Sequence, residues 1–180
     1  MQKKVALSLF FTALLISGCT SLTPYTPVHQ DPMGEGNAIS RIRFVSNITG
    51  TTITLKEDNI ARDLVPHTAL GYYNDTRDIG MPKLSYRPQD YKGYYFEIRV
   101  KPQAMIIKIF SDRTDQGTCS SAFLVVTEAG KDYDVNLDPH EKFTKCVFHF
   151  SEIITDPTTG VVILKPLPFK MVNPWNNHFE

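Results

Sequence analysis

The chain has 180 residues, 42% of them hydrophobic, and its 19 basic side chains balance its 19 acidic ones. This composition argues against disorder, which needs low hydrophobicity and high net charge. The charge balance also argues against nucleic-acid binding, because no basic excess is available to neutralise phosphates. At this length we expect one folded domain.

The first 18 residues have the order of an export signal. Lys3 and Lys4 precede an apolar stretch over residues 5–16, which is shorter than the roughly 20 residues of a membrane-spanning helix. The sequence Leu15-Ile16-Ser17-Gly18-Cys19 follows, and it resembles the lipobox of bacterial lipoproteins. The resemblance implies cleavage before Cys19, a diacylglycerol on its thiol and a further acyl chain, such as palmitate, on the new amino group. An ordinary signal peptide cut nearby is the alternative.

A lipidated Cys19 would anchor the protein, because two or more acyl chains hold a protein stably on a membrane. Thr20 stands where an Asp would resemble the inner-membrane retention signal of Gram-negative lipoproteins. We therefore expect an outer-membrane lipoprotein that faces the periplasm. Residues 19–38 contain Pro24, Pro27 and Pro32 without apolar periodicity, and they predict a lipidated, flexible tether.

From residue 39 the sequence alternates with period two, which is typical of strands. Phe96, Ile98 and Val100 alternate with polar residues, Glu97 among them, so we expect one apolar strand face and one face in water. The apolar runs 104–110 and 122–126 predict central strands buried on both faces. Further strands are expected at 42–44, 53–55, 133–137, 146–151 and 161–164. Residues 51–63 are the one stretch that could instead form a helix.

Gly and Pro residues separate these strands, and Gly130 favours a hairpin between two of them. Even strand spacing with frequent turns predicts a β-sandwich or small barrel. Residues 123–135, followed by Cys146, resemble the final hairpin of small bacterial lipoprotein families of unknown function. That resemblance implies a transthyretin-like or carbohydrate-binding-like sandwich. We expect an all-β, antiparallel β-sandwich over residues 39–164 and a Pro-rich tail over residues 165–180.

The two remaining cysteines, Cys119 and Cys146, form an even pair in an oxidising compartment, which predicts a disulfide. Each is expected just before a strand. They would then lie at one end of a three-stranded meander, or across from each other in facing sheets. Two unpaired buried thiols are the alternative.

Catalytic motifs are absent from the sequence, and we expect no enzyme activity, cofactor or metal. His140 and Glu141 could form a loop cluster for a metal or a general base, and an enzyme would need either His140 or His67 near paired carboxylates. A polar turn is the favoured interpretation. Residues 112–117 contain oxygen ligands, but their spacing does not fit a calcium loop.

Six tyrosines gather between residues 72 and 95, interleaved with basic residues and with Gly and Pro. They are Tyr72, Tyr73, Tyr86, Tyr91, Tyr94 and Tyr95. Tyrosine suits protein interfaces and glycan stacking, and long irregular connections often carry binding residues. We expect a noncatalytic envelope module that binds a protein partner here, with glycan or peptidoglycan binding as the alternative. Packing onto the end of the sandwich would leave the tyrosines without a binding role. The tail with Trp175 is expected to dock on the sandwich rather than on a partner's edge strand.

Overall fold

The computed structural model describes residues 26–34, 38–45, 51–57, 60–64, 76–88, 95–113, 117–140 and 145–173. At some strand ends, residues 119 and 146 among them, only the backbone is described. The strands are β1 (Ser40–Val45), β2 (Thr51–Glu57), β3 (Ile60–Asp63), β4 (Phe96–Val100), β5 (Ala104–Arg113), β6 (Gly117–Val126), β7 (Asp132–His140), β8 (Lys145–Thr155), β9 (Val162–Pro166) and β10 (Lys170–Val172).

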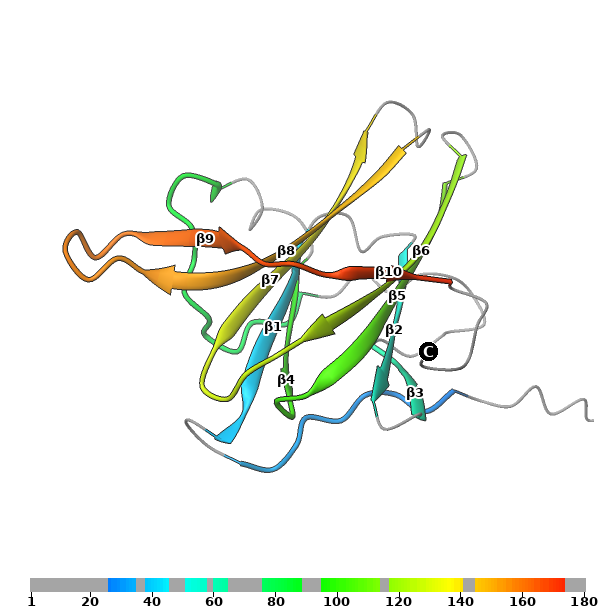
Figure 1. Ribbon diagram of the computed structural model, residues 1–180, viewed down its shortest axis with the longest axis horizontal. Coiled ribbons are helices and arrows are strands. Elements are labelled where there is room, and N and C mark those ends of the chain that lie inside the picture. Colours follow the sequence, from blue (N-terminus) through cyan, green and yellow to red (C-terminus); the bar gives the residue numbers. More distant parts are fainter. Residues whose placement is uncertain are drawn as a thin grey trace, which may run out of the picture.

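The strands form two five-stranded sheets, which makes the chain an all-β sandwich as predicted (Figure 1). Sheet A has the order β10-β6-β5-β2-β3, and sheet B has the order β4-β1-β7-β8-β9. Neighbouring strands are antiparallel except β1 and β7, which pair in parallel. A parallel pair needs a long crossover connection, and here most of the domain separates the two strands. None of the described residues belongs to a helix long and apolar enough to cross a membrane.

Residues 51–57 and 60–63 form two paired strands, so the expectation of a possible helix there was wrong. Thr54 of β2 pairs with Asp63 of β3, and Glu57 pairs with Ile60. The period-two alternation of Ile53 and Leu55 decides the outcome, because it matches the pleat of a strand. β5 and β6 lie inside sheet A, as their continuous apolar runs predicted. The expected burial on both faces was wrong in part, because Phe110 of β5 is 40% exposed and Val126 of β6 is 58% exposed.

Two glycine-containing turns play different parts in the fold. Gly130 takes a positive φ of 75° in the turn between β6 and β7. These strands lie in different sheets, so the turn is a crossover and not the predicted hairpin. The turn at residues 156–160 does join a hairpin, that of β8 and β9, and Gly160 has a φ of 69° there.

The core lies between the sheets. Phe123 of β6 stacks on Phe148 of β8 with ring centroids 3.6 Å apart, and Phe169 meets both rings edge-on. Fully buried aliphatic residues from both sheets surround this stack, among them Ile42, Leu55, Ile98, Met105 and Ile107. At about 25 cal/mol per Å² of buried apolar surface, this layer is the main source of the fold's stability.

Residues 26–34, which we call the N-terminal strap, pack along one side of the sandwich. Val28 forms a parallel bridge with Asp63 at the edge of sheet A. The His29 backbone N–H donates to the Asp63 carbonyl at 2.8 Å, and His29 Nε2 lies 2.9 Å from the Arg99 carbonyl oxygen in sheet B. The strap therefore joins the edges of both sheets, and this part of the predicted tether belongs to the folded domain.

The opposite side is closed by the C-terminal part of the chain. β9 pairs with β8 in sheet B, and β10 then pairs with β6 in sheet A (Figure 1). Between them, the Leu167 N–H donates to the Phe150 carbonyl at 2.9 Å. The predicted tail thus docks on its own domain as far as residue 173, and the sandwich extends beyond residue 164. Trp175 lies outside the described residues.

Candidate interaction site

Residues 76–88, which we call the covering segment, lie across the outer face of sheet B. The segment starts beside β4, where Arg77 forms a parallel bridge with Phe96. The Arg77 N–H donates to the Tyr95 carbonyl at 3.1 Å, and the Glu97 N–H donates to the Arg77 carbonyl at 2.9 Å. The segment then leaves the edge of β4 and passes over the charged side chains of β4, β1 and β7.

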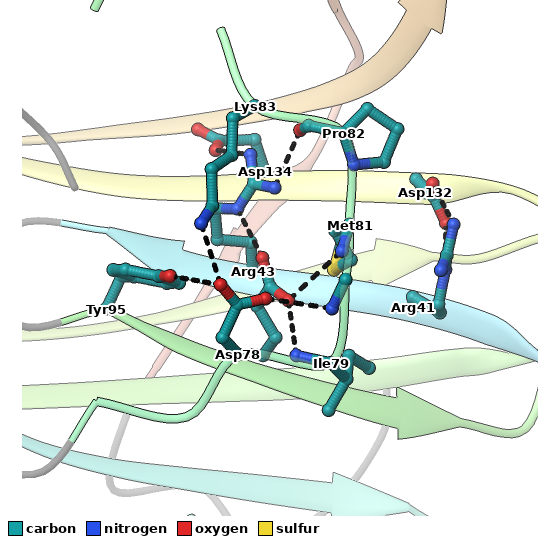
Figure 2. A network of polar contacts seen from close by, with 12 residues as sticks. Arg41, Arg43, Asp78, Ile79, Met81, Pro82, Lys83, Tyr95, Asp132 and Asp134 are labelled. Carbon is teal, nitrogen blue, oxygen red and sulfur yellow. Dashed lines mark hydrogen bonds and ion pairs between the residues drawn. The ribbon is translucent and has the colours of Figure 1, made fainter. Parts of the chain in front are cut away.

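Beneath the covering segment, Arg43 and Glu97 form an ion pair with both side chains fully buried (Figure 2). Arg43 Nε donates to Glu97 Oε1 at 2.9 Å. Their positions follow from the antiparallel register of β1 and β4, which sets the two residues directly opposite each other. Taking such charges out of water costs several kcal/mol per ion, so the pair needs further hydrogen bonds.

The covering segment supplies those bonds from its backbone. The N–H groups of Ile79 and Met81 donate to Glu97 Oε2 at 2.8 and 3.2 Å. Arg43 donates to the Pro82 carbonyl at 2.7 Å. The buried ion pair therefore holds the covering segment on the sheet through main-chain atoms of the segment.

A third charged residue of the same row, Asp134, comes from β7. It pairs with Arg43 in the parallel β1–β7 register. One Asp134 carboxylate oxygen lies 3.9 Å from an Arg43 nitrogen, and the other lies 3.9 Å from an Arg87 nitrogen. Two arginines thus face two carboxylates, and the row of Arg43, Glu97 and Asp134 with Arg87 is balanced in charge.

A second polar group forms where the covering segment leaves β4. Asp78 accepts hydrogen bonds from Lys83 at 2.7 Å, from the Tyr95 hydroxyl at 2.6 Å and from the Gly80 N–H at 2.8 Å (Figure 2). The bonds from Lys83 and then Tyr95 hold the pKa of Asp78 well below its usual range. The bond to Asp78 raises the pKa of Lys83, while burial is the main cause that raises the pKa of Tyr95. This group fixes the turn around Gly80, whose φ is 82°.

The structure separates the two predicted binding tyrosines that it describes. Tyr86 lies on the covering segment with 55% of its surface exposed, whereas Tyr95 is only 4% exposed and uses its hydroxyl to hold Asp78. Tyr95 therefore positions the segment and presents no free ring. Tyr72, Tyr73, Tyr91 and Tyr94 lie outside the described residues.

The backbone positions of the other predicted site residues are only partly described. Cys119 lies within β6 and Cys146 within β8, in facing sheets rather than before the strands of one meander. Their side chains are outside the description, so the disulfide stays a prediction. The same holds for Cys19, for His67 and Glu141, and for the side chain of His140.

Arg43, Glu97 and Asp134 were not predicted as a group. The alternation placed their kind of side chain on a face in water, and for these three residues that expectation was wrong, since all three are buried. The available signal was the presence of opposite charges at matching positions of separate strands. This signal can be used only when the register of β1 with β4 and β7 is known, because the register shows which charges lie opposite each other.

The polar contacts of this arrangement support the covering segment. The buried charges bind each other and the backbone of the covering segment. Within the described ranges, no group of three His, Cys, Asp or Glu side chains could hold a metal ion. What the site offers outward is a fixed loop with an exposed tyrosine beside a partly exposed arginine, Arg87.

The fold and the site thus define a two-sheet β-sandwich with a covering segment held by buried charges. In comparisons with known proteins, no family model, no curated protein and no solved structure matches this chain.

Proposed function

We propose that the protein is a membrane-anchored lipoprotein of the bacterial envelope that binds a protein partner, without catalysis. The binding surface is the tyrosine-rich connection of residues 72–95, whose described part is the covering segment with Tyr86. One observation carries this proposal. The backbone of residues 79–82 is bonded to a fully buried ion pair, while Tyr86 on the same segment is exposed to solvent. The segment is therefore rigid where it meets the sheet and open where it faces outward.

A fixed loop with an exposed aromatic residue is well suited to protein binding. Ordering a flexible loop on binding costs about 0.5–1.5 kcal/mol per immobilised side chain, and a loop already held in place avoids much of that cost. Tyr and Arg are enriched among the residues that dominate interface energies, and Tyr86 and Arg87 are neighbours here. Both features favour a protein partner over a purely structural role for the segment.

The proposed anchor would keep this surface close to a membrane. The strap is bound to the sandwich from residue 27 onward, through the bond from the Asp63 N–H to the Pro27 carbonyl. Only a few residues then separate the domain from a lipidated Cys19. At about 3.5 Å per extended residue, the domain would stay within roughly 25–30 Å of the bilayer surface. A partner in the same membrane, or beside it, would be within reach.

Photo-crosslinking in living cells tests the binding surface. A photoreactive amino acid at Tyr86 is expected to give one discrete protein adduct, identified by mass spectrometry. The matched control carries the same probe at Glu128, which is exposed in the turn between β6 and β7, and should not give that adduct. Adducts to glycan would replace the proposal with cell-wall binding. No adduct from Tyr86, or the same adduct from Glu128, would contradict it.

The anchor has its own test. Replacing Cys19 with Ala should move the protein from the membrane pellet to the supernatant, because the thiol that would carry the diacylglycerol is gone. Cys119→Ser is the control, since it also removes one cysteine but leaves the lipobox intact. Continued pelleting of Cys19→Ala with membranes would contradict lipid anchoring.

A further inference from the structure

β9 is the edge strand of sheet B whose outer side has no partner among the described strands, whereas the outer edges of β3 and β4 each carry a bridge. The edge of β3 carries the bridge to Val28, and the edge of β4 carries the bridge to Arg77. β9 ends sheet B with β8 on one side, and no described strand pairs with its other side. Open edges are templates for pairing with another chain, and proteins usually protect them.

The hydrogen-bond pattern shows which backbone groups of β9 are open. Leu167 donates to the Phe150 carbonyl and Asp156 donates to the Val161 carbonyl, both at 2.9 Å. Hydrogen-bonded pairs alternate along an antiparallel ladder, so in the β8–β9 register the bonded pairs include Ile154 with Ile163. The N–H and C=O groups of Val162 and Leu164 therefore point away from β8.

Apolar side chains flank these open groups. Val161 is 42% exposed and Ile163 is 37% exposed. The β8–β9 hairpin also extends beyond the other strands, so that its free edge is not blocked by them (Figure 1). The hairpin thus combines free backbone groups with exposed apolar side chains, the two features that strand addition needs.

We infer that β9 pairs in antiparallel fashion with β9 of a second copy of this chain, about a two-fold axis at Ile163. In this register Val162 faces Leu164 of the other copy, and each such pair exchanges both of its N–H···O bonds. Ile163 faces Ile163 across the axis. Lys165 faces Val161, so the arrangement sets no lysine against its equivalent. The edge is therefore complementary to itself, as a two-fold interface requires.

The ends of β9 limit the pairing to this short stretch. Pro166 has no N–H to donate. At the other end, the Gly160 N–H is already bonded to the Asp156 carbonyl at 2.8 Å. A pairing centred on Ile163 uses the N–H groups of both Val162 and Leu164. A longer partner strand would find no further N–H donor at Gly160 or Pro166. The contact is small beside the 1,200–2,000 Å² of a stable interface, so we expect a weak dimer.

Cysteine crosslinking of the full chain in bacterial cells tests the register. Facing residues at a non-hydrogen-bonded position have Cα atoms about 4.5 Å apart, within disulfide range. Ile163→Cys should therefore give a reducible dimer on a nonreducing gel. Val161→Cys should give at least about fivefold less, because its equivalents would be more than about 13 Å apart. The double variant Val161→Cys, Lys165→Cys should recover the dimer. The wild-type protein is the control for dimers that form through its native cysteines.

Two proline variants in the Ile163→Cys background separate edge pairing from damage to the hairpin. Leu164→Pro removes an N–H that points away from β8, so the hairpin should persist while the dimer is lost. Val162→Pro, at the other outward position, should act likewise. Circular dichroism and protease resistance of each variant report whether the domain has stayed folded. Equal crosslinking from positions 161 and 163, or a dimer that survives Leu164→Pro, would overturn the inference. An adduct of another mass would assign the edge to a different protein and also overturn it.

Discussion

Glu97 and Ile98 are neighbours on β4, and both are fully buried. Ile98 faces sheet A and is buried in the apolar core. Glu97 faces the other way and is buried under the covering segment, where it binds Arg43 and two backbone N–H groups. At these two residues β4 is therefore buried on both faces, by different means. The comparison shows that alternation tells which side chains share a face, but not whether the polar face meets water.

The largest expected effect comes from breaking the ion pair on the polar side. Glu97→Leu would leave Arg43 buried without its main partner, and we expect a loss of about 3–5 kcal/mol in the free energy of unfolding. Urea denaturation followed by circular dichroism measures it. Glu128→Leu is the control, because its ion pair with Lys131 is exposed to solvent and should contribute little to stability.

The double variant Arg43→Met, Glu97→Leu sharpens the same point. Removing both charges leaves no unpaired ion, so its loss should be smaller than the sum of the two single losses. Additive losses would show that the two residues do not stabilise each other, and that the covering segment is held by other contacts.

On the apolar side, a modest truncation should have a smaller effect. Ile98→Val removes one methylene group from the core, and we expect a loss of about 0.5–1.5 kcal/mol. This loss comes from apolar packing and should not depend on salt. The loss from Glu97→Leu comes instead from charges and from hydrogen bonds to the backbone. The two variants are measured in the same urea series. If Ile98→Val lowers the free energy of unfolding as much as Glu97→Leu does, the buried ion pair is no more sensitive to substitution than the apolar core.

The smallest expected effect concerns Asp78, whose pKa is lowered by its bonds from Lys83 and then Tyr95. A lowered pKa in the folded state contributes stability above the unfolded value near 3.9, and this contribution is lost as the pH falls through the folded value. Asp78→Asn should therefore lose some stability at pH 6 and show a flatter decline below pH 4. We expect less than about 1 kcal/mol, because the Asp78–Lys83 pair is partly exposed. Identical pH profiles for wild type and variant would contradict this assignment.

The sequence was sufficient to predict the all-β sandwich and eight of the strand positions, because period-two alternation is a local property of strands. It did not reveal β10, since Lys170 to Val172 form too short a run beside two prolines. Nor could it reveal the strap, whose residues have no periodic pattern and are held by long-range contacts such as that of Asp31 with Arg77 and Arg99.

The candidate site shows the same limit more sharply. Tyr86 was predicted as a binding residue from its residue type and its setting, and the structure shows that it is exposed, while its binding role stays a prediction. Arg43, Glu97 and Asp134 were missed because their burial depends on a segment elsewhere in the sequence, the covering segment of residues 76–88. A single strand carries no sign of what will later lie over it.

The strap also has a mechanical consequence. Tension that reached the domain through the chain before residue 26 would load the bonds of Pro27 and His29 with Asp63, and then the ion pairs of Asp31, before it reached β1. The strap runs parallel to β3 where the two meet, and the residues to which it is bonded, Asp63 and Arg99, lie in different sheets. The strap would therefore detach before the core is loaded. The hydrogen bonds of β1 with β4 and β7 would carry no tension until the ion pairs of Asp31 have broken.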